Sequence, residues 1–383
     1  MDKLALNGGK PVSAEKINIA KPIIGKETLE QIEKIIESGY LRQGPYVKQF
    51  EDEFRDYVGA KYAYACNNGT SALHLAYLST LNKGDEVIVP SFTFLATASM
   101  VYYSMAKPVF ADVDPETFVI DVEDVKEKIT TKTKAIVPVH LFGNAADIHA
   151  LQNLCNDHRL TLIHDSAQAH GTRYDGKDIG SIGDLGCYSF YPSKTLTTGE
   201  GGMVTTNNTE LDQKGRLLRA HGDDGRYHHI MLGFNYRLTE IQAVLGLDQM
   251  RKFNSFLKRR RECGEYLKDK ISAIDGLIPQ KITDKVESSY SYFSLTINPE
   301  KYRGTRDTFM KALQAENIDC AVHYPTPLTK QPIIQEMFKP KRCKVSEMLS
   351  ENIMSLPIHP DITDENLKSI VAGVEKVATY YKK

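Results

Sequence analysis

Short apolar runs alternate with helical patterns along the first two thirds of the chain, and this alternation constrains the fold more than any other feature of the sequence. The runs predicted to be strands are 62–66, 85–90, 109–113, 135–140 and 160–165. The segments predicted to be helices between them are 70–81, 91–104, 121–129 and 146–158. Strands connected through helices are typical of a mainly parallel sheet covered on both faces. Because ligands bind at the carboxyl ends of strands in such sheets, we expect an α/β protein with its site at that edge.

The flanking segments predict three parts. Residues 1–22 carry several glycines and prolines that break regular structure, and we interpret them as an N-terminal arm. Residues 23–250 form a large domain that holds the sheet. Residues 251–383 change character, with short strands and separate helices, and predict a smaller α+β domain packed over the large one. The cleft between the two domains is the expected ligand site.

One long helix joins the two predicted domains. It begins at Thr239, where the sequence Thr-Glu-Ile-Gln is typical of a capping box, and it extends to about residue 268. The basic run Lys258–Arg261 lies within it, and we interpret this run as the solvated face of the helix.

Lys194 is the strongest candidate for chemistry in the chain. It follows a strand-like run that ends at 189–191 and lies among hydroxyl residues that could bind an anion, namely Ser193, Thr195, Thr197 and Thr198. The glycines at 199–202 would let the backbone approach a ligand closely. A lysine amine attacks an aldehyde only in its neutral form, so a lysine in this setting favours a Schiff base. A solvated surface lysine is the alternative.

Asp165 ends the apolar run 160–165 and is the candidate partner of Lys194. A carboxylate at this position favours a protonated ring nitrogen in an aldehyde cofactor through charge pairing. A protonated ring withdraws electrons and lets a carbanion form beside it. A simple capping role at the end of the strand is the alternative for Asp165.

A second strand end predicts a phosphate site. The run 62–66 is followed by the turn Asn67-Asn68-Gly69 and by a helix that starts near Thr70. Free N–H groups and the positive end of the helix dipole gather at such a start. A hydroxyl cap is compatible with the same residues. Phe94, which follows the run 85–90, could lie flat on a cofactor ring, although core packing is the commoner role of an aromatic residue.

Composition excludes several classes of protein. The chain of 383 residues is 41% hydrophobic and 25% charged with a formal net charge of −1, so no excess charge of one sign favours nucleic acid or a membrane surface. We expect no membrane span, no signal peptide and no metal, although His228 and His229 are adjacent. Six cysteines lack Cys-x-x-Cys spacing and fit a reducing cytoplasm.

Several segments together resemble the sugar-nucleotide aminotransferases of the DegT/DnrJ/EryC/StrS group, and the resemblance spans nearly the whole chain. They are CNNGTSALHLA, GDEVIVPSFTFLATA, KAIVPVHLFGN, HDSAQAHG, GCYSFYPSKTLTTGEGGMVTTN, GFNYRLTEIQAVLG and HYPTPL. The resemblance implies fold type I of the pyridoxal-phosphate-dependent transferases, with a large domain and a smaller C-terminal α+β domain. It also implies a homodimer with shared active sites.

The resemblance also assigns roles to residues. It implies that Lys194 forms a Schiff base with pyridoxal 5′-phosphate and that Asp165 pairs with the ring nitrogen. The other implied cofactor contacts are Gln168 near the ring, Phe94 stacked on it, Gly69, Thr70 and Ser189 at the phosphate, and Asn235 at the phosphate of the neighbouring subunit. Candidates for binding substrate are His323, Tyr324, His221 and Arg226, with an ordinary surface loop as the alternative for the last two.

The implied reaction moves an amino group from L-glutamate, which leaves as 2-oxoglutarate, to a nucleotide-linked keto-deoxysugar in amino-sugar biosynthesis, for example of lipopolysaccharide O-antigen. The segment Thr-Thr-Gly-Glu-Gly-Gly after Lys194 resembles members that aminate C4, whereas members that aminate C3 carry a different segment. Amination at C3 or of another cyclic ketone is the alternative.

Three other functions fit the sequence less well. The first is a dehydratase of the same group, but those dehydratases carry histidine where this chain has Lys194, so the lysine argues against this function. A non-catalytic pyridoxal-phosphate-binding paralogue would lose substrate residues, but His323 and Tyr324 are present. A nicotinamide dehydrogenase would need a Gly-x-Gly-x-x-Gly turn between strand and helix, and the glycines at 199–202 precede a strand instead.

Overall fold

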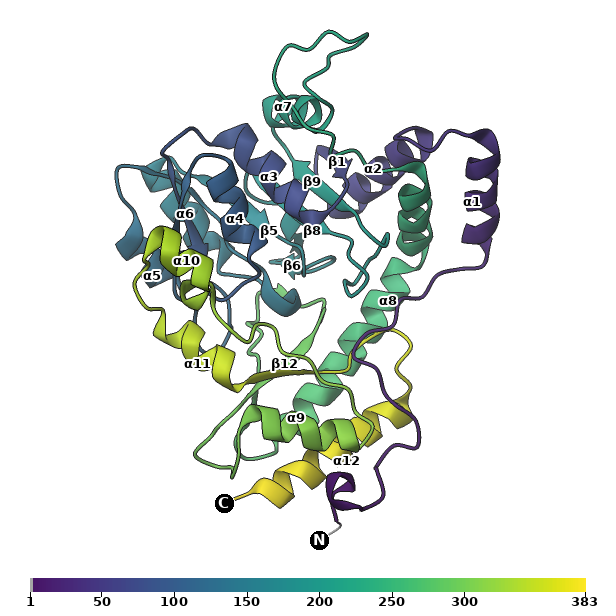
Figure 1. Ribbon diagram of the computed structural model, residues 1–383, viewed down its shortest axis with the longest axis vertical. Coiled ribbons are helices and arrows are strands. Elements are labelled where there is room, and N and C mark those ends of the chain that lie inside the picture. The colour runs from purple at the N-terminus through teal and green to yellow at the C-terminus, as the bar shows by residue number, and fades with distance from the viewer. Residues whose placement is uncertain (1–2) are drawn as a thin grey trace.

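The computed structural model describes residues 3–383 and contains the expected helix-covered sheet (Figure 1). Seven strands are ordered β1-β9-β8-β5-β4-β2-β3, and their pairing is parallel from β8 to β3, while β9 is antiparallel to both of its neighbours. The strands are β1 Tyr62–Cys66, β2 Glu86–Pro90, β3 Lys107–Ala111, β4 Thr133–Ile136, β5 Thr161–Asp165, β8 Leu185–Ser189 and β9 Gly202–Thr206. The predicted α/β class and mainly parallel sheet are therefore confirmed.

Helices cover both faces of this sheet because neighbouring residues of each strand point to opposite sides. In β2, Val87 and Val89 join the core beneath one set of helices, and Ile88 between them joins the core beneath another. The first set is α3 Gly69–Thr80, α4 Ala96–Tyr103 and α7 Thr209–Arg219; the second is α5 Val122–Lys128 and α6 Ile148–His158. The strands are thus apolar on both faces, as buried parallel strands require.

Two element boundaries at the edge of the large sheet differ from the predictions by four or five residues. The helix predicted over 91–104 begins at Ala96, because residues 91–95 form a loop that carries Thr93 and Phe94 over the sheet edge. The strand predicted over 135–140 ends at Ile136, although the N–H of His140 still donates to the carbonyl of Asp165 at 3.1 Å. Both differences lie at the edge where the site forms.

The C-terminal part packs around a second, three-stranded antiparallel sheet, below the large sheet in Figure 1. Its strands are β10 Leu277–Pro279, β12 Phe293–Ile297 and β13 Ile353–Leu356. Its helices are α9 Arg306–Ala315, α10 Pro332–Phe338, α11 Lys344–Asn352 and α12 Asp364–Tyr381, and neither α10 nor α11 was predicted. Short strands β6 Arg173–Tyr174, β7 Lys177–Asp178 and β11 Val286–Glu287 form a small third sheet.

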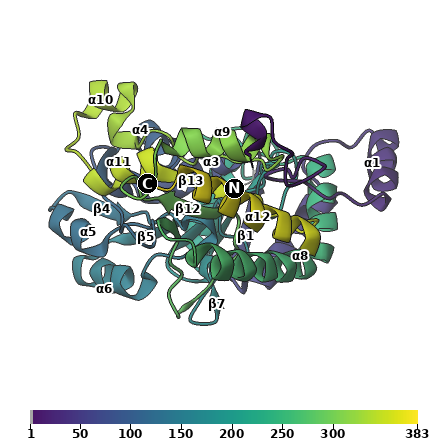
Figure 2. The same ribbon diagram turned by 90° about the horizontal axis from the view of Figure 1, so that it is seen from below.

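Helix α8 Glu240–Ser272 runs from the upper part into the lower part (Figure 1). The capping box predicted at its start is confirmed, since the Thr239 side chain accepts from the N–H of Gln242 and the Gln242 side chain accepts from the N–H of Thr239. Because α8 is continuous through residues 250 and 251, the division into domains there stays a prediction. Two further helices, α1 Glu27–Ser38 and α2 Pro45–Val58, pack against α8, and α1 extends to one side in Figures 1 and 2.

The interpretation of Lys258–Arg261 as a solvated face is wrong for Arg260. Its side chain is only 3% exposed, and its Nη1 donates to the carbonyls of Ser291 at 3.3 Å and Ile358 at 3.0 Å. Burial lowers the pKa of this guanidinium to about 10. A local charge pattern did not reveal this burial, because the carbonyl partners come from segments about 30 and 98 residues away along the chain.

The arm packs against the C-terminal part and lies beside α9 and α12 at the bottom of Figure 1. Leu4 and Ile17 belong to that core, and Ile17 forms a parallel bridge with Ile318. The carboxylate of Glu316, which is fully buried, accepts from the N–H of Ala5 at 2.8 Å and is 2.9 Å from the ammonium of Lys376 on α12. One buried carboxylate therefore connects the arm to the last helix.

We expect Glu316→Gln to lower the free energy of unfolding by about 3 kcal/mol, because it leaves Lys376 without its buried counter-charge. Urea denaturation at pH 7 measures this loss. Glu300→Gln, which changes an exposed glutamate of the same region, is the control and should change stability by less than about 0.5 kcal/mol. Equal stability of the two variants would contradict the proposed anchoring of the arm.

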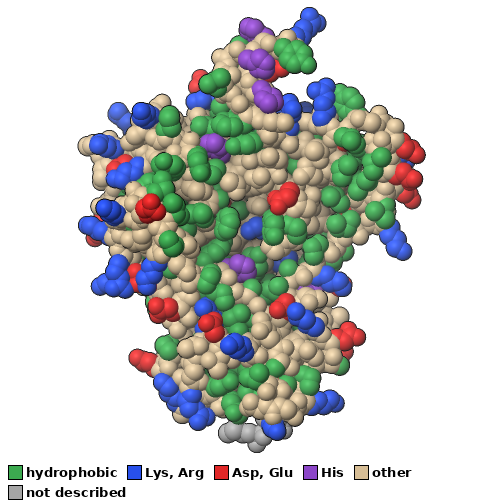
Figure 3. Space-filling model, in the orientation of Figure 1, with side chains coloured by type: hydrophobic (Ala, Val, Ile, Leu, Met, Phe, Trp, Pro, Cys, Tyr) green, Lys and Arg blue, Asp and Glu red, His purple; other side chains and the backbone are tan. Residues whose placement is uncertain are grey.

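The segment 221–232 protrudes from the top of the molecule beyond α7, and histidines and apolar side chains gather on it (Figure 3). Tyr227 and Leu232 are 91% and 94% exposed. Across residues 3–383, no three His, Cys, Asp or Glu side chains are grouped to hold a metal ion. Within the same range, no helix combines the length and the apolar character needed to cross a bilayer.

Candidate active site

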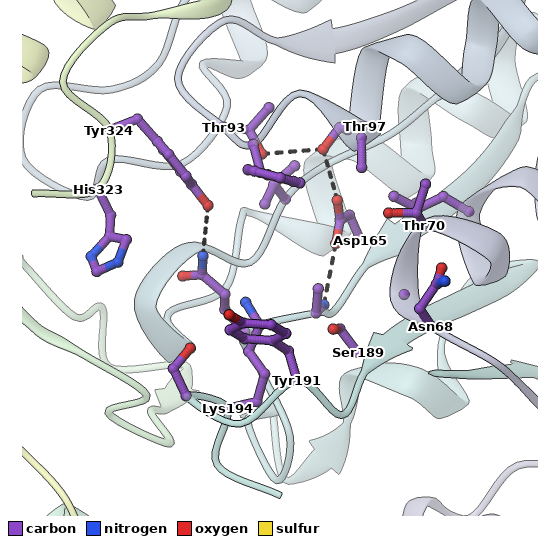
Figure 4. A pocket seen from close by; sticks show the side chains of 18 of the residues that line it. Asn68, Thr70, Thr93, Thr97, Asp165, Ser189, Tyr191, Lys194, His323 and Tyr324 are labelled. Atoms are coloured by element: carbon purple, nitrogen blue, oxygen red, sulfur yellow. Dashed lines mark hydrogen bonds between the residues drawn. The ribbon is translucent and has the colours of Figure 1, made fainter. Parts of the chain in front are cut away.

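A cavity of about 540 Å³ opens at the carboxyl edge of the large sheet (Figure 4). Residues that follow β1, β2, β5 and β8 line it on one side, and His323 and Tyr324 from the C-terminal part line it on the other. Among the predicted site residues, those brought together here are Gly69, Thr70, Phe94, Asp165, Gln168, Ser189, Lys194, His323 and Tyr324. The edge predicted from the strand pattern is therefore the edge where the cavity lies.

Lys194 reaches this cavity from a tight turn that follows β8. Its N–H donates to the carbonyl of Tyr191 at 2.9 Å, and Pro192 occupies the second position of the turn, where its fixed backbone angle is favourable. The side chain is half-buried. Burial lowers the pKa of the Lys194 amine to about 8, and the charge of Asp165 partly opposes this shift. About a tenth of the amine is therefore neutral at pH 7, far more than for an ordinary lysine.

Asp165 is the last residue of β5, is 4% exposed, and faces the cavity. One carboxylate oxygen accepts from the hydroxyl of Thr97 at 2.8 Å, and the other accepts from the N–H of Ala167 at 3.2 Å. Burial raises the pKa of this carboxyl, whereas the two donors and the charge of Lys194 oppose the rise. Asp165 and Lys194 line one cavity without forming an ion pair within the described chain, which leaves room for a ligand between them.

The start of α3 forms an anion cradle at one end of the cavity. The side chain of Asn68 accepts from the N–H of Ser71 at 2.8 Å, whereas the N–H groups of Gly69 and Thr70 bond to no acceptor in residues 3–383. A Cβ atom at Gly69 would lie 2.5 Å from Cβ of Ser189, so only glycine allows the two segments to come this close. Two free amides, a helix N-terminus and the adjacent hydroxyls suit a phosphate.

Gln168 connects the sheet edge to the C-terminal part. Its Nε2 donates to the hydroxyl of Tyr324 at 2.9 Å, the bond drawn to Tyr324 in Figure 4. Its Oε1 accepts from the N–H of Phe142 at 2.9 Å. Phe94 is 59% exposed at the mouth of the cavity, and its ring centroid is 6.2 Å from that of Tyr324. An exposed aromatic ring at a cavity mouth is available to a planar ligand.

Three predicted residues lie outside the cavity of the single chain. Asn235 is exposed and forms a bridge with Ala220, and His221 and Arg226 are exposed within the protruding segment 221–232. Their predicted contacts, of which that of Asn235 was expected in a neighbouring subunit, remain predictions.

The sequence signals around Lys194 were partly misleading. The hydroxyls of Thr197 and Thr198 donate to the carbonyls of Phe190 at 2.9 Å and Glu200 at 2.6 Å, so they serve the turn and not an anion. Gly202 allows the backbone to approach Asn68 closely rather than a ligand, since a Cβ at Gly202 would lie 2.3 Å from the carbonyl oxygen of Asn68. Lining residues that were not predicted as contacts include Thr97, Tyr191 and Tyr292, whereas Ser193, one of the hydroxyl residues predicted around Lys194, does line the cavity. The available signal for Thr97 was a threonine in the first turn of α4, next to the end of a strand.

The arrangement defines a class of enzyme. An amine with a lowered pKa, a buried carboxylate and an anion cradle surround one cavity, and these groups match the aldehyde, the ring nitrogen and the phosphate of pyridoxal 5′-phosphate. The crowding at Gly69 and the free amides beside it are the features of this chain that fit the phosphate best. The fold and the cavity are those of a pyridoxal-phosphate-dependent transferase.

Comparison with known proteins gives the family. Residues 22–375 match the DegT/DnrJ/EryC1/StrS aminotransferase family, and the chain belongs to it. GDP-perosamine synthase of Caulobacter vibrioides is 35% identical over 94% of this chain and 98% of its own length. UDP-N-acetyl-3-dehydro-alpha-D-glucosamine 3-aminotransferase of Acidithiobacillus ferrooxidans is 36% identical over 91% of this chain and 93% of its own.

A solved structure agrees with this assignment. The PLP form of Spr1654 of Streptococcus pneumoniae, described as a sugar aminotransferase, superposes with a TM-score of 0.89 at 27% identity and covers 95% of this chain and 99% of that one. The protein is therefore a sugar-nucleotide aminotransferase that uses pyridoxal 5′-phosphate.

Proposed function

We propose that this enzyme transfers the amino group of L-glutamate to the C4 ketone of a nucleotide-linked keto-deoxysugar, within a homodimer. The observation that carries the transfer chemistry is one cavity holding the Lys194 amine, whose pKa is about 8, opposite a buried Asp165. The choice of C4 is supported by the segment Thr-Thr-Gly-Glu-Gly-Gly at 197–202, which resembles that of family members aminating C4.

In this proposal each cavity residue has a stated task. Pyridoxal 5′-phosphate, when bound, supplies an aldehyde that takes up the amino group and a ring that withdraws electrons from the reacting carbon. Asp165 holds the ring nitrogen, and its burial keeps water away from that contact. Gly69, Thr70 and Ser189 bind the phosphate. Lys194 removes a proton from one carbon and returns it to another as general base and acid, a role worth roughly 10²–10⁴-fold in rate.

The homodimer is proposed because the cavity of a single chain is poor in positive charge. Lys194 is the one lysine or arginine among its described lining residues, yet the diphosphate of a nucleotide sugar and the carboxylates of glutamate are all negative. Arg226 and His221 lie on the protruding segment 221–232 and Asn235 lies just beyond it, and none of the three lines the cavity of its own chain. A second copy that presents this segment would add the missing donors.

Amination at C3 is the second candidate, and one observation favours it. The relative from Acidithiobacillus ferrooxidans, whose name specifies a 3-aminotransferase, is as similar to this chain as the perosamine synthase is.

A substrate panel separates the candidates. The enzyme is incubated with L-glutamate and with GDP-, UDP- and dTDP-linked keto-sugars whose ketone lies at C4 or at C3, and mass spectrometry detects the amino sugar. We expect conversion of a C4 ketone at least tenfold faster than of any C3 ketone. Faster conversion of a C3 ketone overturns the position, and no conversion with glutamate when another amino acid works overturns the donor.

The pH dependence of cofactor capture gives a further prediction. Because only the neutral amine reacts, the rate at which apo-protein captures pyridoxal 5′-phosphate should rise with pH and level off above about 8, the pKa of Lys194. The charge of Asp165 raises that pKa, so Asp165→Asn should move the midpoint to lower pH. Stopped-flow absorbance measures both profiles, and a midpoint near the ordinary lysine value in both proteins would contradict the assignment.

A further inference from the structure

Ser193 and Tyr292 form a hydrogen bond beside Lys194 that no element of the proposed function uses. The hydroxyl of Tyr292 donates to Oγ of Ser193 at 2.8 Å, which connects two residues 99 positions apart in the chain. Tyr292 is 5% exposed and immediately precedes β12, whereas Ser193 lies in the turn that presents Lys194. Both residues line the cavity.

The direction of the bond between Tyr292 and Ser193 determines whether the Ser193 hydroxyl can still donate a hydrogen bond. A serine hydroxyl carries one hydrogen and accepts through its lone pairs. Since Oγ of Ser193 accepts from Tyr292, its own hydrogen remains available, and within residues 3–383 it donates to no acceptor. A half-buried donor on the cavity wall without a protein partner is a ready contact for a ligand oxygen, because an unpaired polar group loses solvation when a ligand closes the cavity.

The position of Tyr292 is fixed from two sides. Arg260 holds the preceding residue through the carbonyl of Ser291 at 3.3 Å and also holds the carbonyl of Ile358 at 3.0 Å. On the cavity side, the ring of Tyr292 packs against the imidazole of His323 with centroids 4.4 Å apart. A ring held in this way keeps its hydroxyl directed at Ser193.

We propose that Ser193 donates its hydrogen bond to a hydroxyl or carbonyl oxygen of the sugar at the carbon presented to Lys194, and that Tyr292 is the positioning residue that orients this donor. The inference rests on the proposed function, because it adds a sugar-reading contact to the same site. In this proposal the contact serves the sugar alone, so the half-reaction with glutamate does not use it.

The test compares the two half-reactions in Ser193→Ala, Tyr292→Phe and the double variant. We expect each single variant to lower kcat/KM for the keto-sugar by about tenfold, the effect of one lost hydrogen bond of about 1.4 kcal/mol. The double variant should be no worse than Ser193→Ala, because both substitutions remove the same contact. The glutamate half-reaction should keep its rate. The probe is the keto-sugar that wild-type enzyme converts in the panel above.

A binding measurement adds a readout that does not depend on turnover. Calorimetry with the amino sugar isolated from the wild-type reaction should show weaker binding to Ser193→Ala and Tyr292→Phe. Tyr290→Phe is the matched control, since it removes a buried tyrosine hydroxyl that bonds to Glu265 at 2.5 Å away from the cavity. It should keep both half-reactions and the affinity.

The outcomes separate the two proposals. If wild-type enzyme aminates no nucleotide sugar, the proposed function fails. If wild-type enzyme is active and Ser193→Ala keeps full kcat/KM and affinity for the sugar, the inference about Ser193 is overturned while the function stands. Equal losses of rate in both half-reactions would mean that Ser193 and Tyr292 form only a structural contact. Additive losses in the double variant would mean the same. Either result would also overturn the inference about Ser193.

Discussion

Lys194→Ala is expected to lower kcat by about 10⁴-fold or more and to remove the visible absorbance of enzyme-bound pyridoxal 5′-phosphate. In the proposed function Lys194 both captures the aldehyde and moves the proton, so the variant would lack the amine and the general base together. The fold should persist, since the Lys194 side chain forms no hydrogen bond within residues 3–383 and its backbone N–H bond to Tyr191 remains. Absorbance spectra and steady-state rates measure the two effects.

Lys311→Ala is the control for that experiment, because Lys311 is an exposed lysine on α9 that does not line the cavity. It should keep the spectrum and the rate of wild-type enzyme. A visible band of full intensity in Lys194→Ala would mean that another amine holds the aldehyde, and the account of the cavity would be wrong.

Asp165→Asn is expected to keep cofactor binding but to lower kcat by roughly 10²–10³-fold, the usual effect of removing one preorganised charge that stabilises a transition state. Asparagine preserves the shape of the side chain, and its one amide oxygen can still accept from the N–H of Ala167, which the carboxylate now does at 3.2 Å. Its NH2 group would donate to the hydroxyl of Thr97, which now donates to the carboxylate at 2.8 Å. The negative charge is therefore lost while both neighbours keep a bonding partner. Rates of the glutamate half-reaction under single-turnover conditions isolate this effect from substrate binding.

Asp361→Asn serves as the matched control, since Asp361 is a surface carboxylate paired with Lys21 at 2.5 Å. Surface pairs contribute little, so its rate should equal that of wild-type enzyme. Single-turnover rates of Asp165→Asn within threefold of wild type would contradict the role given to this carboxylate.

The sequence predicted the sheet edge well because the signals there are local. The run 160–165 ends at the same Asp165 that ends β5, and the turn at 67–69 begins α3. Alternation of apolar runs with helices and a capping box at Thr239 depend on residues within a few positions of each other, which a single sequence displays.

Contacts between distant segments were not predictable in this way. The bond from Tyr292 to Ser193 and the burial of Arg260 depend on how the C-terminal part packs on α8 and on the cavity. A basic run such as Lys258–Arg261 reads as solvated unless three-dimensional packing supplies carbonyl acceptors. Helices α10 and α11 were not predicted because they are short and lie between prolines and charged residues.

The central claim is that Lys194 forms the Schiff base with pyridoxal 5′-phosphate, and a chemical experiment tests it most directly. Enzyme loaded with pyridoxal 5′-phosphate is reduced with borohydride, digested, and mapped by mass spectrometry. We expect one phosphopyridoxyl group, attached to Lys194. A label on any other lysine, or none at all, would contradict it.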